Sequence, residues 1–227
     1  MNLRPLAIAA TVAIAVMLVA AAWGWGQVPA GTQVPIHWGI DGRPDGFAPK
    51  EVAFFVLPAL AGGLTLLLTL LPRFEPRSAN LVRSSSAYVQ VGIAMLVVVT
   101  ILQLTTVLAA SGRPVDVSLV VGLTVGGMFV VLGNVLGKVR SNFIFGVRTP
   151  WTLASDRSWN KTHRLVGRLF VLLGLAVVLA GLVGGYVALF STLIGGIVLV
   201  LVVCCVYSYR VWRNDPDKQP IGRQPAA

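Results

Sequence analysis

The densest group of polar, cationic and aromatic side chains in this sequence lies in residues 137–164, within an otherwise apolar chain. At its centre, Arg148, Thr149, Pro150 and Trp151 follow one another, and Pro150 restricts its own backbone and that of Thr149. This predicts a rigid turn. Guanidinium and ammonium groups bind carboxylates and phosphates, so the group favours contact with an anionic lipid, or with an acidic or phosphate-bearing partner.

The turn is followed by a predicted helix, in which Ser155 serves as the N-cap and Asp156 favours the first turn. Four cations then recur at helical spacing as one basic stripe: Arg157, Lys161, Arg164 and Arg168. A second face carries Trp159, His163, Val166 and Phe170. The pattern predicts an amphipathic stretch at the membrane surface.

Three interpretations of this region remain open. The stripe and the aromatic residues are typical of an anchor on anionic lipids. They also suit a docking surface. A catalytic role would rest on His163, but no Asp, Cys or Ser constellation is visible around it. Arg77 and Arg213, which lie outside the region, are interpreted as charges that only set the topology.

A second polar group lies in residues 29–51, where the density of proline and glycine predicts a turn-rich loop without a long helix. His37, Asp41 and Asp45 are candidate metal ligands. Aspartate also bonds readily to nearby backbone in turns, so we favour local hydrogen bonds and predict no metal and no cofactor. Trp38 is expected to seat the loop at the membrane interface.

These two groups are positioned by apolar segments, because 56% of the chain is hydrophobic and only 11% is charged. We predict an all-α, multi-pass protein of the cell membrane. It has six transmembrane helices at 5–26, 52–71, 86–110, 117–136, 166–184 and 188–208. The last two helices form one apolar tract that is too long for a single crossing and should fold back near Gly184 and Gly185.

Charge predicts the orientation of these helices. Alternate loops hold 15 and 3 of the 18 Lys and Arg residues, so both termini are expected in the cytoplasm, N-in and C-in. The net charge of +10 then reflects topology, and we predict no direct binding of nucleic acid. The first apolar run also has features of a cleaved signal peptide, but we expect the helix to be retained.

The chain is divided into four parts on this basis. Residues 1–71 form a two-helix module with the outer loop, 72–116 a linking helix, 117–210 a module with the cytoplasmic loop 137–168, and 211–227 a disordered tail. Glycines recur in the fourth and fifth helices, which favours close packing there, although glycine is also common in membrane helices generally. Within the six helices, no Asp, Glu, His, Lys or Arg is found at depth, which disfavours an ion-coupled transporter.

Both polar groups resemble the SdpI family of bacterial multi-pass membrane proteins. The first resemblance rests on Pro35, His37, Trp38, Gly42, Pro44, Asp45 and Lys50. The second rests on Gly133, Asn134, Lys138, Arg140, Asn142, Phe143, Gly146, Arg148, Thr149, Pro150, Trp151, Asp156, Trp159, His163 and Arg164. Ser141 departs from the family pattern, in which a proline is expected.

The resemblance implies an immunity-type role without enzymatic activity. The founding member of the family protects against a secreted, membrane-active peptide toxin and captures a cytoplasmic transcriptional repressor. As partners, the resemblance implies membrane lipids, a peptide toxin of this kind and a cytoplasmic repressor of this kind. The implied inner binding residues are Asn134, Lys138, Arg140, Asn142, Arg148, Thr149, Pro150, Trp151, Asp156, Trp159, His163 and Arg164. Those of the outer loop are His37, Trp38, Asp41, Asp45 and Lys50. The alternatives are a membrane enzyme or transporter for a lipid or small amphiphile, and a structural scaffold.

Overall fold

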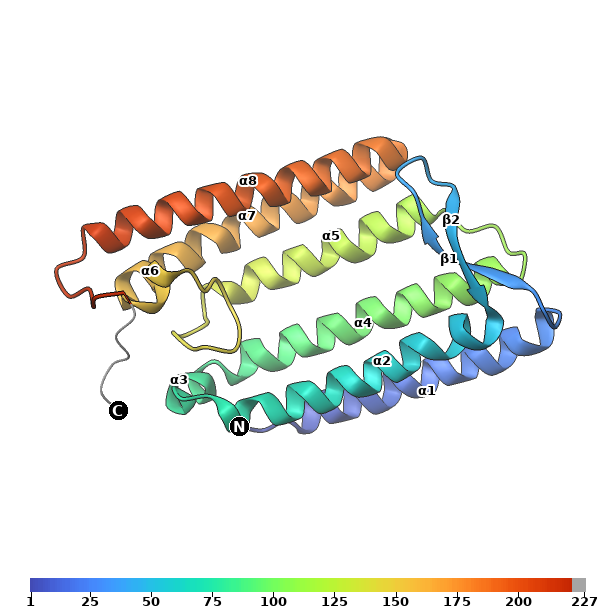
Figure 1. Cartoon of the computed structure of the whole chain (residues 1–227), viewed down its shortest axis with the longest axis horizontal. Coiled ribbons are helices and arrows are strands. Elements are labelled where there is room, and N and C mark those ends of the chain that lie inside the picture. Colours follow the sequence, from blue (N-terminus) through green and yellow to red (C-terminus); the bar gives the residue numbers. More distant parts are fainter. Residues whose placement is uncertain (222–227) are drawn as a thin grey trace.

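The computed structural model describes residues 1–221 and is dominated by six long helices (Figure 1). These are α1 (Arg4–Gln27), α2 (Lys50–Leu70), α4 (Ser85–Ala110), α5 (Val117–Leu136), α7 (Asp156–Val183) and α8 (Gly185–Arg213). Each is long and apolar enough to cross a bilayer, which confirms the all-α, six-helix membrane class. The chain turns between α7 and α8 at Gly184, as predicted, and Gly185 has a φ of +64° that favours glycine.

Residues 29–51 differ from the turn-rich loop that the sequence predicted. Strands β1 (Gln33–Trp38) and β2 (Pro44–Pro49) pair there as an antiparallel hairpin. The prolines that obscured the strands are compatible with them, because each strand of a two-stranded ribbon has an outer edge where a missing N–H is tolerated. The hairpin is therefore the one sheet in the described part of an otherwise helical fold.

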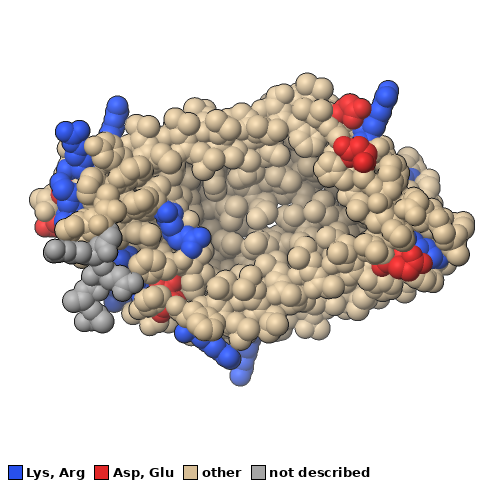
Figure 2. Space-filling view, in the orientation of Figure 1, with Lys and Arg blue, Asp and Glu red and all other residues tan. Residues whose placement is uncertain are grey.

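The six helices form two groups of three, as Figure 1 shows. In one group, α1 packs against α2 and α4, and in the other, α7 packs against α5 and α8. The groups meet chiefly along α4 and α5. The visible face is hollowed between them (Figure 2). The N-terminus and the C-terminal end of α8 lie at one end of the bundle, the termini end, and the hairpin lies at the other, the hairpin end (Figure 1).

Glycine brings α5 and α7 together along their whole contact. A Cβ added to Gly133 would lie 2.5 Å from the carbonyl oxygen of Gly167, and one added to Gly126 would lie 2.7 Å from that of Gly174. These approaches confirm the close packing that the glycines predicted. Only residues without a side chain allow backbones to come this near.

Three shorter elements lie at the termini end: the 3-10 helix η1 (Leu71–Phe74), α3 (Ser78–Arg83) and α6 (Pro150–Leu153). The tail 211–227 was expected to be disordered, but its first part is ordered in the structure. Helix α8 continues to Arg213, Asp215 is buried and bonded to the Ser155 hydroxyl, and Gln219 N donates to Ala154 O at 2.9 Å. The tail packs because the start of α7 offers it polar partners. Residues 222–227 lie outside the described residues.

Candidate functional site

At the termini end, the loop between α5 and α7 is held from outside by the segment that contains η1, α3 and the start of α4. Glu75 Oε2 accepts from Phe143 N at 3.0 Å, Asn80 Nδ2 donates to Ser141 O at 2.9 Å, and Ser84 Oγ accepts from Arg140 N at 2.8 Å. Sequence reasoning missed these holding residues. One feature of the sequence could have pointed to them: Glu75 is the one acidic residue in the basic stretch 71–84.

Arg77 was interpreted from the sequence as a charge that only sets the topology, and its contacts show that it also holds the loop. Its guanidinium donates to the Ser141 hydroxyl and, at 3.2 Å, to Leu153 O, and it lies 4.8 Å from the centre of the Phe143 ring. Arg77 thus joins both ends of the loop. Ser141, the departure from the family pattern, supplies a hydroxyl that a proline would lack.

Asn142 organises the loop from within. Its side chain is fully buried, and its Oδ1 accepts from Ile144 N and Phe145 N, each at 2.9 Å, while its Nδ2 donates to Arg140 O at 2.8 Å. The amide thus pairs backbone groups that a non-helical loop would otherwise leave without partners.

Trp159 and His163 fix the loop to α7. Both are fully buried and their rings stack with centres 4.1 Å apart. Trp159 Nε1 donates to Val139 O at 2.7 Å. His163 Nε2 accepts from Val147 N at 2.9 Å, so its Nδ1 carries the proton donated to Trp159 O at 2.8 Å. With both ring nitrogens bonded to backbone, the imidazole is placed as a structural group rather than as a catalytic one.

The predicted turn at Thr149 and Pro150 takes the form of a capped helix start. Thr149 is the N-cap of α6, it forms a capping box with Thr152, and Pro150 takes the first helical position. Thr149 Oγ1 also donates to Ser208 Oγ at 3.1 Å, and Trp151 packs edge-on against Tyr209 with ring centres 5.4 Å apart. Both contacts bind α6 to α8.

The predicted inner residues therefore divide into two sets. The holding set has partners inside the protein and comprises Asn142, Thr149, Pro150, Trp151, Trp159 and His163. The exposed set is solvent-accessible and comprises Asn134, Lys138, Arg140, Arg148, Asp156 and Arg164, and of these the Arg148 guanidinium also donates to Phe143 O of the loop. The rest of the predicted basic stripe, Arg157, Lys161 and Arg168, is exposed as well, whereas Ser155 caps α7 through Ser158 N as predicted. Asn134 lies apart from the loop and donates to Val130 O of its own helix.

At the hairpin end, the acidic residues form the local contacts that the sequence favoured. His37 Nδ1 lies 2.5 Å from Asp45 Oδ1, and Asp41 Oδ1 accepts from Arg43 N at 3.1 Å. Within residues 1–221, no three His, Cys, Asp or Glu side chains gather as a metal site needs. Lys50 is buried: its Nζ donates to Val28 O at 2.9 Å and lies 4.3 Å from the centre of the Trp25 ring, so it anchors the base of the hairpin.

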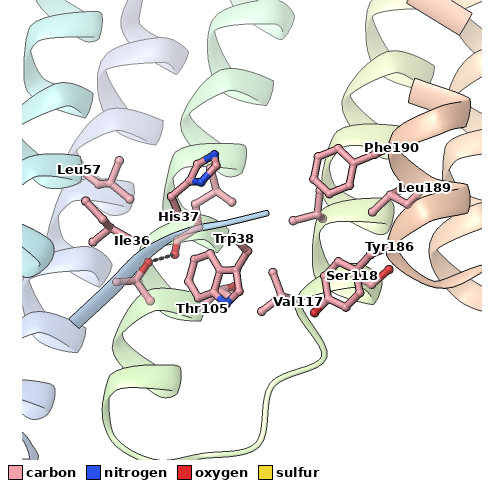
Figure 3. Close-up of a pocket in the computed structure, with 13 residues that line it drawn as sticks. Ile36, His37, Trp38, Leu57, Thr105, Val117, Ser118, Tyr186, Leu189 and Phe190 are labelled. Atoms are coloured by element: carbon pink, nitrogen blue, oxygen red, sulfur yellow. Dashed lines mark hydrogen bonds between the residues drawn. The ribbon is translucent and has the colours of Figure 1, made fainter. Parts of the chain in front are cut away.

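Beneath the hairpin lies a cavity of about 280 Å³ between the two helix groups (Figure 3). Trp38 projects into it from β1, with Leu57 of α2 on one side and Tyr186 and Phe190 of α8 on the other. The hairpin is seated directly on α8, because a Cβ added to Gly42 would lie 2.2 Å from the Tyr186 ring. The sequence predicted Trp38 as an interfacial residue but gave no sign of this cavity.

A known protein family matches the loop between α5 and α7 and the two long helices that follow it. Residues 138–208 match the SdpI/YfhL protein family. Residues 12–62, which include the hairpin, match a domain of unknown function, DUF1648. The chain is also 28% identical over 185 residues to the immunity protein SdpI of Bacillus subtilis (strain 168), across 80% of this chain and 84% of that protein.

The family match confirms the resemblance that the motif residues from Lys138 onward indicated, and it supports a multi-pass location in the cell membrane. It begins at Lys138, so it contains the loop, α6, α7 and most of α8. The SdpI/YfhL signature is thus the segment in which the holding set joins the loop to α7 and α8. No solved structure matches the chain.

Proposed function

We propose that this chain is an integral membrane immunity-type protein that protects the bilayer against a membrane-active peptide. The observation that carries the proposal is the similarity to a protein named for immunity, which extends over most of both chains.

The hairpin end is the proposed contact for the peptide. With both termini inside, as charge favours, the hairpin and its exposed Ile36, Ile40 and Phe47 face the exterior, where a secreted peptide arrives. Exposed apolar side chains beside a cavity offer contacts for an amphipathic peptide. The peptide would bind the hairpin and the adjoining ends of α2, α4, α5 and α8.

The exposed set at the termini end is the proposed inner docking surface. Lys138, Arg140 and Arg148 are solvent-exposed on a loop whose backbone is fixed by the holding set, and Arg164 is exposed on α7. A rigid cationic surface recognises an acidic partner at low entropic cost. We propose that this surface captures a cytoplasmic repressor when the peptide is bound, and that the remaining cations of the stripe rest on anionic lipid.

Protection is tested by expressing the chain in a sensitive bacterium that is challenged with a membrane-active peptide of a related producer. The intact chain should raise survival, and Trp38→Ala should reduce that gain by at least several-fold, because the ring fills the space beneath the hairpin. Arg113→Ala is the matched control. It alters an exposed residue of the same end on the loop between α4 and α5 and should leave survival unchanged.

Membrane abundance of each variant is measured in parallel, so that loss of protein is separated from loss of protection. Equal survival with and without the intact chain would overturn the proposed function. Full protection by Trp38→Ala at normal abundance would remove the hairpin end as the contact site and leave the helix surfaces.

A further inference from the structure

The glycine contact between α5 and α7 fixes which residues of the two helices share one side of the pair. Three glycine pairs meet there backbone to backbone: Gly133 with Gly167, Gly126 with Gly174, and Gly122 with Gly181. The residue numbers rise along one helix as they fall along the other, so the helices are antiparallel. Each residue turns a helix by about 100°, and antiparallel helices turn in opposite senses when seen from one end. The residue after each glycine therefore lies on the same side of the pair.

These residues form one surface, the seam side, which comprises Asn134, Gly127 and Leu123 of α5 and Arg168, Leu175 and Leu182 of α7. Gly127 is half-buried and the other five are exposed. The level nearest the termini end carries the Asn134 amide and the Arg168 guanidinium, whereas the other two levels are apolar. Arg168 and Leu175 are seven residues apart, which is about 10 Å of helix. The seam side thus changes from cationic to hydrocarbon over about 10 Å.

The Arg168 guanidinium has no acidic partner in the described part of the chain. Both ion pairs within residues 1–221 lie in the hairpin. Asp156, the acidic residue of α7, lies twelve residues earlier, about 18 Å along the axis. From Leu169 to its end at Val183, α7 has no charged residue. Arg168 therefore marks the edge of the hydrocarbon layer, where an unpaired guanidinium favours an anionic group.

A groove of about 400 Å³ between α4 and α5 continues the seam side. Leu123 and Gly127 belong to both, and Val97 of α4 lies opposite them in the lining. A Cβ added to Gly127 would have no heavy atom within 4 Å, so the space beside it is open. No charged residue lines the groove, and Gln90, in the second turn of α4, supplies an amide toward the termini end. The groove therefore has the same order as the seam side, polar toward the termini end and hydrocarbon beyond.

We infer that the seam side and this groove bind one anionic phospholipid of the leaflet at the termini end. Its phosphate lies at Arg168 and Asn134, one acyl chain runs along Leu175, and the other enters the groove beside Gly127. Asn134 Nδ2 donates one hydrogen to Val130 O and keeps a second for a phosphate oxygen. A head group with its own ammonium would place a second cation beside Arg168, so a head group such as that of phosphatidylglycerol fits best. This site deepens the lipid contact proposed for the basic stripe.

The test uses the full chain in phosphatidylcholine vesicles that contain a trace of photoreactive lipid with a diazirine in the middle of one acyl chain. Photoreactive phosphatidylglycerol should label Leu175 and Gly127 several-fold more than photoreactive phosphatidylcholine does, relative to labelling at Val198, an exposed residue of α8. Unlabelled phosphatidylglycerol should remove this excess. An equal ratio of the two probes at Leu175 and at Val198 would overturn the inference. Because the vesicles hold no peptide or repressor, that result would leave the immunity role standing.

Two variants separate a single site from general attraction to a positive surface. Arg168→Gln should raise the phosphatidylglycerol fraction needed for half-competition by about 5-fold, as expected for one lost cation at the lipid surface. Arg210→Gln removes the same charge from an exposed position of α8 at the same end and should change that fraction less than about 2-fold. Unchanged labelling by photoreactive phosphatidylcholine shows that each variant keeps its fold. Equal effects of the two variants would mean that no single site exists.

Discussion

At the residue scale, the candidate inner site is a set of side chains that complete backbone hydrogen bonds. Asn142, Trp159 and His163 are fully buried, and each bonds to main-chain groups of the loop or of α7. A long loop without strands or helices has many unpaired N–H and C=O groups. These side chains supply partners, and so they set the shape in which the exposed cations are presented.

His163→Ala should lower the free energy of unfolding by about 2–4 kcal/mol. It removes a fully buried ring and leaves Val147 N and Trp159 O without their side-chain partner. Thermal unfolding of the purified protein in one fixed detergent measures the change as a lower Tm.

Arg164→Ala is the matched control for this prediction, since it alters the next residue of α7 at an exposed position. Its effect should stay within about 0.5 kcal/mol. Similar losses of stability from both variants would show that His163 does not hold the loop.

At the element scale, the seam between α5 and α7 depends on which face of each helix carries glycine. Gly122, Gly126 and Gly133 face Gly181, Gly174 and Gly167, each pair meeting backbone to backbone. Apolar side chains give little association energy in lipid, so close backbone packing contributes much of the attraction between these helices.

Gly126→Ala should destabilise the protein by about 1–3 kcal/mol, because the new methyl group would lie 2.7 Å from Gly174 O in a contact that leaves no room for it. Gly127→Ala adds the same methyl group one residue later, where no heavy atom lies within 4 Å. It should be neutral or slightly stabilising, because alanine favours the helix. The Tm of each variant measures these effects. An equal fall in Tm for the two variants would mean that α5 and α7 do not pack through this face.

At the scale of the whole molecule, the arrangement places the N-terminus, the end of α8 and the loop that begins the family match at one end and the hairpin at the other (Figure 1). Lys and Arg of the hairpin end, within residues 1–221, are Arg43, Lys50 and Arg113. The greater positive charge of the termini end predicts that it faces the cytoplasm.

Cysteine labelling tests this orientation in a background with Cys204→Ala and Cys205→Ala. Asp45→Cys, on the exposed hairpin, should react with a membrane-impermeant maleimide in intact cells. Ser78→Cys, exposed at the termini end, should react only after the membrane is opened. The reverse pattern would show that both termini face outward.

The sequence by itself determined the class of the molecule, its six helices and the reversal between α7 and α8. Apolar run length and helix-breaking glycine are local properties, and the bilayer sets the length that a helix needs. The motif residues also located the family signature. His163 and the N-cap Ser155 could be placed on their helix because capping and helical spacing act over a few residues, whereas at the start of α6 the sequence predicted only a turn.

Only the tertiary structure decided what these residues touch. Arg77 contacts Ser141, which lies 64 positions further along the chain, and Asp215, which follows α8, contacts Ser155, which precedes α7. No local pattern encodes such pairs. The hairpin could not be predicted because its strands contain prolines. A strand tolerates proline only where the missing N–H would face outward, and the sequence does not show which edge of a strand does so. The cavity beneath the hairpin arises where helices from both groups meet, so it follows from packing and not from any one segment.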